Sequence, residues 1–330
     1  MIARFAIPFF FVMSLVVVPL VLTLLCRWLL PRRWRRPVVA VLVLLLWGTV
    51  AYGYFVGFRQ IEVHQVEFVS SDLPEAFDGY RIVQFSDAHV GTLTGSRQQL
   101  LRRAIDTINA QQPDAIVFTG DLQNVWPTEL EQQIPLLSRL HAKDGVFSVL
   151  GNHDYAVYQD CDTNEKKHNC QLTCQAERQM GWTLLNNAHR IIRRDSDSLV
   201  IAGMENWGVV KRMPRRGDVQ KTLAGLTLHH PSPTTHHPFI VMLQHDPSCW
   251  REKILPECHA QLTLSGHTHG GQVSLFGWSP VSLTYGEWGG ATYEGDRAIY
   301  VSTGLGGLIP FRLGLPGEIV VITLKTKKIK

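Results

Sequence analysis

The chain has 330 residues, of which 45% are apolar and only 18% are charged. This composition excludes a disordered chain and a collagen-like repeat, because the apolar surface suffices for a packed core and the glycines follow no period. The charge is distributed unevenly. Residues 1–59 hold seven arginines and no lysine, aspartate or glutamate, so the 32 basic residues of the whole chain leave 25 for residues 60–330, against 28 acidic ones. The net charge of +4 therefore averages a basic, apolar segment and a domain of net charge −3.

The N-terminal part contains two apolar segments, residues 5–26 and 37–58, each without a charged side chain. A helix of this length rises about 33 Å, enough to cross a hydrocarbon core of about 30 Å. Residues 27–36 lie between the segments and are too few for a domain. They contain five arginines: Arg27, Arg32, Arg33, Arg35 and Arg36. We predict a transmembrane helical hairpin with a basic loop over residues 27–36.

A cleaved signal peptide is the alternative interpretation of the first segment, because the segment begins close to Arg4. No small-x-small cleavage site follows it, and Leu25 before Cys26 is too large for lipoprotein-type processing, so we favour a retained anchor. The positive-inside rule assigns the arginine-rich loop to the cytoplasm. We therefore expect a multi-pass protein of the plasma or inner membrane, with residues 60–330 on the extracytoplasmic side.

Five cysteines lie in the second part of the chain. In an oxidising compartment four of them can form two disulfides, and Cys249 with Cys258 is the nearest candidate pair. The alternative is a small zinc site, although its spacing fits no common ligand pattern. That site would use Cys161, His168, Cys170 and Cys174. The sequence leaves the connectivity open.

Residues 60–330 alternate strand-like and helix-like segments, which is typical of βαβ units in an α/β domain. Helical spacing predicts helices over residues 96–111 and 129–141. Apolar runs and alternating patterns predict strands over residues 61–69, 80–85, 115–118, 146–150, 199–202, 239–243, 261–265, 298–301 and 318–324.

Five of these predicted strands end in a loop that carries Asp, His or Asn. One such loop alone is typical of a turn with a capping side chain, but capping does not explain five in succession. Open α/β sheets place their ligand crevice at the carboxyl ends of the strands. We therefore expect one site that contains Asp87, His89, Asp121, Asn152, His153, His245, His267 and His269.

Apart from His153, this set offers seven oxygen and nitrogen donors, which are too many for one metal ion and suit two if a carboxylate bridges them. Two divalent metal ions lower the pKa of a shared water and stabilise both oxygens of an in-line displacement at phosphorus. The chain has no Gly-x-Ser-x-Gly elbow, Walker loop or dinucleotide fingerprint. These patterns predict phosphoester hydrolysis by a hydroxide that bridges two metal ions.

In order and spacing, the motifs of residues 80–270 resemble the calcineurin-like metallophosphoesterase superfamily, whose pattern is Asp-x-His, Gly-Asp, Gly-Asn-His-Asp/Glu, a single His and Gly-His-x-His. The segment from Gly270 to Leu324 is similar to the membrane-associated bacterial branch. The resemblance implies two mixed β-sheets packed face to face and flanked by helices. It implies one metal held by Asp87, His89, Asp121 and His269, and a second held by Asp121, Asn152, His245 and His267, with Asp121 bridging.

The resemblance also implies that His153 binds the phosphate or protonates the leaving oxygen. In many members a second Asp lies three residues after the bridging Asp and orients this histidine, whereas this chain has Asn124 there. An amide can hold the imidazole by a hydrogen bond, but it cannot stabilise an imidazolium by charge. His153 and Asn124 are the candidate catalytic residues.

Substrate and partners are inferred from the anchor. A hairpin followed by a short tether holds the site near lipid headgroups, so we expect the bilayer as a partner and a phosphodiester or pyrophosphate lipid as substrate. Two alternatives stay open: a soluble nucleotide or phosphomonoester outside the cytoplasm, and a catalytically inactive metal-binding scaffold. The net charge of −3 gives no basic footprint for nucleic acid. No obligate protein partner is evident.

Three further segments have two interpretations each. The histidines of residues 229–237 are expected in a solvated loop and not in a metal site, because Pro, Ser and Thr surround them. Residues 160–174 form either a specificity lid or a plain surface insertion. Arg312 either contacts a substrate phosphate or packs within the fold.

Overall fold

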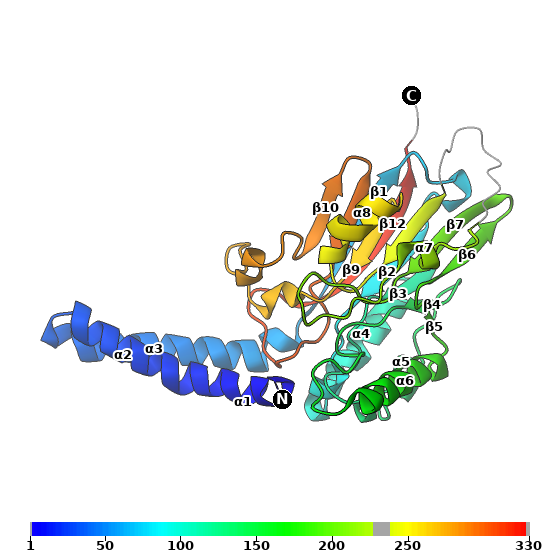
Figure 1. Cartoon of the computed structure of the whole chain (residues 1–330). Coiled ribbons are helices and arrows are strands. Elements are labelled where there is room, and N and C mark those ends of the chain that lie inside the picture. Colours follow the sequence, from blue (N-terminus) through cyan, green and yellow to red (C-terminus); the bar gives the residue numbers. More distant parts are fainter. Residues whose placement is uncertain (1, 227–237, 328–330) are drawn as a thin grey trace.

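The computed structural model describes residues 2–226 and 238–327, which form two six-stranded sheets packed face to face and a pair of long helices that projects from one end (Figure 1). The histidine-rich tract of residues 229–237 lies outside the described residues.

The projecting pair consists of two antiparallel helical rods (Figure 1). The first runs through α1 (Ile2–Val12), a π-helical turn at Met13–Val17 and α2 (Val18–Leu29), and the second is α3 (Arg32–Phe55). Pro19 lacks an N–H to donate to the preceding turn, which explains the π-helical widening before it. Ile7–Leu29 and Arg32–Arg59 are long and apolar enough to span a membrane, with mean hydropathies of 2.8 and 2.1.

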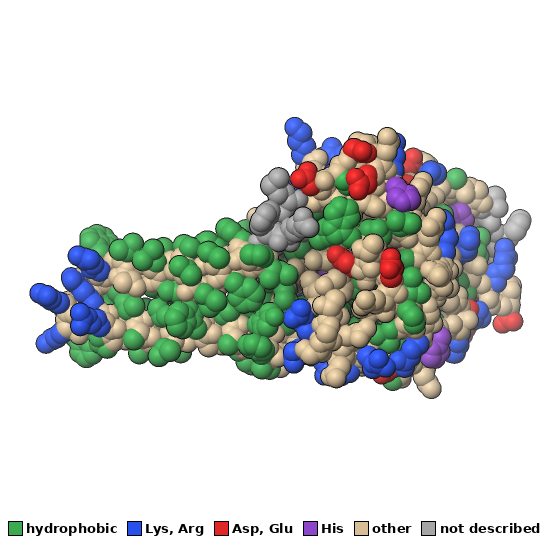
Figure 2. Space-filling model, turned by 90° about the horizontal axis from the view of Figure 1, so that it is seen from below, with side chains coloured by type: hydrophobic (Ala, Val, Ile, Leu, Met, Phe, Trp, Pro, Cys, Tyr) green, Lys and Arg blue, Asp and Glu red, His purple; other side chains and the backbone are tan. Residues whose placement is uncertain are grey.

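The arginine-rich segment is not the ten-residue loop that the sequence predicts. Only Leu30 and Pro31 lie between the helices, because Arg27 belongs to α2 and the other four arginines form the first turns of α3. The Arg35 guanidinium donates to the Leu30 carbonyl at 2.9 Å, so an arginine itself closes the turn. These arginines lie where α2 ends and α3 begins, and Lys and Arg side chains gather at the end of the pair far from the sheets in Figure 2.

The first sheet has the strand order β1-β12-β2-β3-β4-β5. Its strands pair in parallel except where β12 meets β2. The bounds are β1 (Ile61–Ser70), β12 (Gly317–Thr326), β2 (Arg81–Phe85), β3 (Ala115–Phe118), β4 (Val146–Ser148) and β5 (Thr183–Leu184).

The second sheet has the order β10-β11-β9-β8-β7-β6, with antiparallel edges at β10 and β6 and parallel pairs between them. Both sheets are therefore mixed, as the family resemblance implies. The bounds are β10 (Gly290–Glu294), β11 (Arg297–Val301), β9 (Leu262–Ser265), β8 (Phe239–Leu243), β7 (Asp197–Gly203) and β6 (Ala188–Arg194).

Alternating side chains of the central strands build three apolar layers. In β3, Ala115 and Val117 face the second sheet, whereas Ile116 and Phe118 pack on the helical side. That side is covered by α4 (Gln98–Ala110) and α6 (Thr163–Gln179). Trp250 begins a short helical stretch with α8 (Leu255–Glu257) and covers the outer face of the second sheet.

Some predicted elements differ from the structure. The predicted helix over residues 129–141 is only the four-residue α5 (Ile134–Leu137), flanked by turns. The strands β5, β6 and β10 and the helices α6 and α7 (Val219–Thr222) were not predicted. The 160–174 segment includes most of α6, whose first turn is capped by the Asp162 carboxylate.

The predicted disulfides are not present. All six cysteines lie within the described residues, and all are free thiols. Cys170 and Cys174 are one turn apart on α6, and Cys249 is fully buried in the outer apolar layer, where it packs as a small apolar side chain. The metal-binding groups found among the described residues do not include Cys161, His168, Cys170 or Cys174.

The end of α3 is joined to the domain by close backbone contact. The Arg312 amide donates to the Gly53 carbonyl at 3.2 Å, and the rings of Phe311 and Phe10 lie 4.9 Å apart. Only glycine fits at position 53, because a Cβ there would be 2.2 Å from the Phe311 ring. Arg312 is fully buried and donates to the carbonyls of Thr303, Gly304, Gly306, Leu315 and Pro316. It packs within the fold and is not available to a substrate phosphate.

Candidate metal centre

The polar loops predicted from the sequence converge at the carboxyl ends of parallel strands in both sheets. The loops after β2, β3 and β4 come from the first sheet, and those after β8 and β9 from the second. They bring together all seven candidate ligands: Asp87, His89, Asp121, Asn152, His245, His267 and His269.

One group consists of Asp87, His89, Asp121 and His269, whose ligating atoms lie within 4.8 Å of one another. The Nε2 atoms of His89 and His269 are 3.2 Å apart, and His269 Nε2 is 3.4 Å from Asp87 Oδ1. Asp121 Oδ2 lies 3.7 Å from His89 Nε2. Carboxylate oxygens and imidazole nitrogens aimed at one point form a donor set suited to a divalent transition metal.

A second group consists of Asp121, His245 and His267. Asp121 Oδ2 lies 3.3 Å from His245 Nε2, which is 3.2 Å from His267 Nδ1. Asn152 Oδ1 is 3.1 Å from the same His245 nitrogen and adds a fourth donor. Asp121 belongs to both groups, so its carboxylate can bridge two ions.

The loops that carry the ligands have an unusual backbone. Five of the seven candidate ligands adopt positive φ angles, between 42° and 72°: Asp87, His89, Asp121, His267 and His269. Such angles are uncommon for residues other than glycine, and they persist where the surrounding structure enforces them. Close packing of the loops supplies that constraint, because a Cβ at Gly266 would be 2.0 Å from Ser86 Oγ.

Buried hydrogen bonds fix the ligands further. The Asp154 carboxylate accepts from the amides of Asp121, Leu122 and Gly151 at 2.8, 3.0 and 2.9 Å, which joins the loops after β3 and β4. His245 Nδ1 donates to the Thr119 carbonyl at 2.7 Å, which leaves its Nε2 as the nitrogen that can bind metal.

The electrostatics of the groups favour a cation beside Asp121. Burial opposes ionisation of this carboxyl, but the charges of His245 and His153 lower its pKa well below the usual range. Burial likewise opposes protonation of His245, yet Asp121 outweighs it and raises the pKa of His245 to about 10. Burial lowers the pKa of His89 to about 3 and raises that of Asp87 to about 7. A neutral His89 and an ionised Asp121 fit a metal centre, and His245 would release its proton when a cation binds beside Asp121.

His153 lies at the edge of both groups. Its amide donates to Asp121 Oδ1 at 2.8 Å, and its ring centroid is 4.7 Å from that of His89. Its Nδ1 donates to the main-chain carbonyl of Asn124 at 2.5 Å, so the contact expected from the Asn124 side chain is made by the backbone instead. The Glu129 carboxylate holds that backbone by accepting from the amides of residues 124–126.

Several neighbours of the site were missed by sequence reasoning. Tyr285 Oη is 2.9 Å from His267 Nε2, and the Arg212 guanidinium lies 5.7 Å from the centre of the Tyr158 ring, which packs on His153. Asp154 could have been predicted from the sequence, because it is the last residue of the Gly-Asn-His-Asp motif. Tyr158, Arg212 and Tyr285 lie in loops without a pattern, so only the folded chain reveals them.

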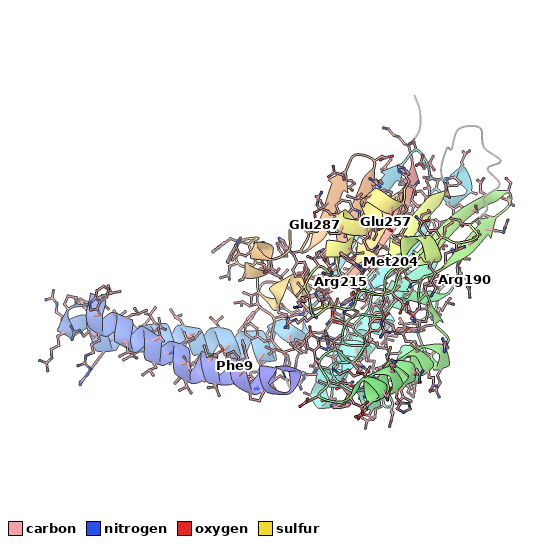
Figure 3. The ribbon with its side chains drawn as sticks, in the orientation of Figure 1. Phe9, Arg190, Met204, Arg215, Glu257 and Glu287 are labelled. Atoms are coloured by element: carbon pink, nitrogen blue, oxygen red, sulfur yellow. The ribbon has the colours of Figure 1, made fainter. Side chains whose placement is uncertain are left out.

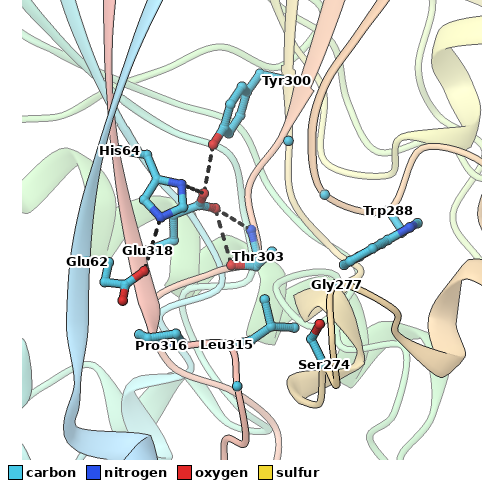
Figure 4. Close-up of a pocket in the computed structure, with 13 residues that line it drawn as sticks. Glu62, His64, Ser274, Gly277, Trp288, Tyr300, Thr303, Leu315, Pro316 and Glu318 are labelled. Carbon is cyan, nitrogen blue, oxygen red and sulfur yellow. Dashed lines mark hydrogen bonds and ion pairs between the residues drawn. The ribbon is translucent and has the colours of Figure 1, made fainter.

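A cavity of about 350 Å³ lies beside β1 and β12, outside the two ligand groups (Figure 4). In its wall the buried Glu318 carboxylate accepts from Tyr300 Oη at 2.8 Å and from the Thr303 amide at 2.6 Å, and lies 3.1 Å from His64 Nδ1. The ion pair with Glu318 raises the pKa of His64 to about 9. This network fixes the 303–306 loop, whose Gly306 amide donates to the Asp87 carbonyl.

Comparison with known proteins decides the family. Residues 80–271, more than half of the chain, match the sequence model of the calcineurin-like phosphoesterases. The chain belongs to the calcineurin-like phosphoesterase family. The chain is 33% identical to the uncharacterized metallophosphoesterase YkuE of Bacillus subtilis, across 83% of this chain and 90% of that protein.

Two further relatives of this phosphoesterase have informative names. A transmembrane protein with metallophosphoesterase domain of Danio rerio is 30% identical, over 86% of this chain and 62% of that protein. The UDP-2,3-diacylglucosamine pyrophosphatase LpxG of Chlamydia trachomatis is 27% identical, over 76% of this chain and 86% of that protein. The chain is thus similar to one protein named as transmembrane and to another named as a pyrophosphatase.

Replacing Asp154 by Asn tests how the protein positions its candidate ligands. The amide replaces one acceptor oxygen by an NH2 group, which places a donor against backbone N–H donors. We therefore expect the free energy of unfolding to fall by about 1–3 kcal/mol. We also expect Mn²⁺ affinity to fall on the order of tenfold, because Asp121 loses its support. Calorimetric titration and thermal unfolding measure the two effects, with Asp195→Asn as control, since Asp195 is exposed and lies outside the candidate metal groups. Unchanged Mn²⁺ affinity in Asp154→Asn would contradict this positioning role.

Proposed function

We propose that this protein is a membrane-anchored phosphoester hydrolase that uses two divalent metal ions. The observation that carries the proposal is the shared Asp121, whose carboxylate belongs to both ligand groups. Membership of the calcineurin-like phosphoesterases supports a metal-dependent hydrolase. Asp87, His89, Asp121 and His269 would hold one ion, and Asp121, Asn152, His245 and His267 the other.

The chemistry divides between the ions and the protein. Two bound ions supply the charge that activates a water and stabilises the attacking and leaving oxygens at phosphorus. His153 stands beside Asp121 and can hold a proton for the leaving oxygen. The Asn124 carbonyl fixes the His153 ring through Nδ1, which leaves Nε2 for this proton. Arg212, exposed and near Tyr158, offers a positive charge to the substrate phosphate.

A lipid phosphodiester or pyrophosphate is the substrate class that the anchor favours. The two apolar helices fix the domain at the membrane surface if they span the bilayer. The name of LpxG, a UDP-2,3-diacylglucosamine pyrophosphatase, supports a pyrophosphate bond in a lipid precursor as the target. A soluble nucleotide outside the cytoplasm and a catalytically inactive scaffold are the two competing outcomes of the activity experiment.

We further propose that the domain lies on the extracytoplasmic side. The five arginines at the far end of the helical pair would then face the cytoplasm, in keeping with the positive-inside rule (Figure 2). Because both termini of the pair lie at the other end, the domain would follow on the opposite side of the membrane (Figure 1).

A reporter fused after Lys330 tests this sidedness. Alkaline phosphatase, which folds only in an oxidising compartment, should be active when fused there. Green fluorescent protein fused at the same position should not fluoresce. Replacing the five arginines by glutamine removes the topological signal and should mix the two orientations. A fluorescent protein fusion that is bright, together with an inactive phosphatase fusion, would place the domain in the cytoplasm and reverse the assignment.

Hydrolysis by the purified full-length protein in detergent tests the function. With Mn²⁺, we expect cleavage of bis(p-nitrophenyl) phosphate and, in a wider panel, preference for lipid phosphodiesters or pyrophosphates over soluble nucleotides. His153→Ala should reduce turnover by roughly 10²–10⁴ while metal content is retained, because proton transfer is lost and the ligands are not. Asp121→Asn should lose both metal content and turnover.

The matched control is His259→Ala, since His259 with Asp72 and Asp296 forms a partly exposed cluster away from the two ligand groups. It should keep both metal content and turnover. No hydrolysis by the metal-loaded native protein would favour the inactive scaffold, and preference for soluble nucleotides would replace the lipid substrate. Unchanged turnover of a poor leaving group by His153→Ala would remove His153 from the reaction.

A further inference from the structure

A short turn at the domain surface exposes an aromatic side chain. The amides and carbonyls of Leu275 and Trp278 pair with each other at 2.9 and 3.0 Å, which closes a two-residue hairpin turn. Its first central residue is Phe276, at a φ of 54°, followed by Gly277 at 81°. Such turns favour Asn or Asp at that position, and a bulky residue there is costly. Phe276 is fully exposed, so packing within the protein does not offset that cost.

Phe276 is part of a larger apolar surface. Leu275, Trp278 and Leu283 are also exposed, the last at the end of the short helix Pro280–Leu283. We call residues 275–283 the apolar tip. Outside the two long helices, the exposed large apolar side chains of the described residues are few, and half of them lie in this tip. Contiguous exposed apolar groups on a soluble face mark an interaction surface.

The segment that carries the tip is hydrogen-bonded to residues that pack on the domain-proximal end of the helical pair. The Ser274 amide donates to the Leu313 carbonyl at 2.8 Å, and Gln272 Nε2 donates to the Ile309 and Phe311 carbonyls at 2.8 and 2.7 Å. Phe311 in turn packs on Phe10 and Gly53 of the helices. The segment that carries the tip lies beside the domain-proximal ends of α1 and α3 (Figure 1).

The same end of the helices carries exposed aromatic side chains, as expected where helices leave a bilayer. They include Phe9, which is labelled in Figure 3, with Tyr52 and Phe55. The apolar tip therefore lies close to the level at which the helices would pass from hydrocarbon to headgroups.

The tip also belongs to the loop that borders the metal centre. His269 precedes it by six residues, and Tyr285, two residues beyond it, contacts His267 through its hydroxyl. The chain thus leaves the ligand group at His269, forms the tip, and returns to the site at Tyr285. A surface that binds the tip therefore contacts the same chain segment that carries His269 and Tyr285.

We propose that the apolar tip inserts into the bilayer leaflet next to the domain, so that the metal centre takes its phosphoester from the lipid surface. The inference rests on the proposed function for the reaction, but the insertion itself does not. A bilayer is the occupant because the segment that carries the tip is hydrogen-bonded to residues 309–313, and Phe311 packs on the domain-proximal end of the spanning helices. Amphipathic elements with Phe, Trp and Leu seat in this way at the headgroup boundary.

Photo-crosslinking in vesicles tests the insertion directly. The full chain is reconstituted in phosphatidylcholine–phosphatidylglycerol vesicles with Phe276 replaced by p-benzoylphenylalanine. The matched control carries the same replacement at Tyr293, an exposed aromatic on β10 outside the tip. We expect a phospholipid adduct at position 276 and none at 293. A crosslink to a second copy, or no lipid adduct at 276, would overturn the proposal.

A second measurement tests the consequence for substrate access. The variant Phe276→Asn with Leu283→Ser removes apolar groups while Asn keeps the left-handed turn, and Tyr293→Ser is the control. With phosphatidyl-p-nitrophenol in vesicles, we expect the tip variant to lose turnover on the order of tenfold. Soluble bis(p-nitrophenyl) phosphate should be cleaved as by the native chain.

Equal loss on both substrates would overturn the role of the tip in presenting lipid. Failure of the native chain to cleave either ester would instead refute the proposed function. The lipid adduct is read without turnover, so the two failures are distinguishable.

Discussion

The buried carboxylate of Asp121 is the group around which the rest of the structure is arranged. An ionised carboxylate away from water is costly unless it is paired and hydrogen-bonded. Here it lies 3.3 Å from His245 Nε2 and 3.7 Å from His89 Nε2, and its other oxygen accepts from the His153 amide. Strands from both sheets must therefore end at one point, which the face-to-face packing achieves. Because this carboxylate belongs to both ligand groups, the two groups form one centre suited to two ions instead of two separate histidine clusters.

The positions of these groups depend on a network of hydrogen bonds that reaches the helical pair. Arg312 is fully buried and donates to carbonyls of residues 303–306, while its own amide donates to Gly53 in α3. The 303–306 loop is fixed from the other side by Glu318 and donates to the backbone at Asp87. A continuous path of hydrogen bonds thus connects the helical pair to the first ligand group. Within our proposal this path fixes the orientation of the site relative to the bilayer.

Much of the fold could be predicted from local patterns, and the failures have physical causes. β3 and β8 have the predicted bounds because they are short apolar runs followed by a loop that carries site residues. α6 escaped prediction because its buried face is largely polar, with Asn169, Thr173 and Glu177, so it lacks an apolar stripe. The predicted helix over 129–141 has helical spacing, but Pro135 lacks the N–H that a longer helix would need there, so the backbone is α-helical only over Ile134–Leu137 and forms turns on either side. The candidate ligands could be predicted as a set because each follows a strand, whereas Tyr285 and Arg212 reach the site through loops. The contact of Asn124 with His153 runs through the backbone, which residue identity does not reveal.

Anomalous diffraction from crystals of the Mn²⁺-loaded full-length protein tests the central claim most directly. The account predicts two anomalous peaks, one on each side of the Asp121 carboxylate, separated by about 3.5–4 Å. The first should lie among Asp87, His89 and His269, and the second among Asn152, His245 and His267. A single peak in the site, or peaks only at the partly exposed cluster of Asp72, His259 and Asp296, would contradict it.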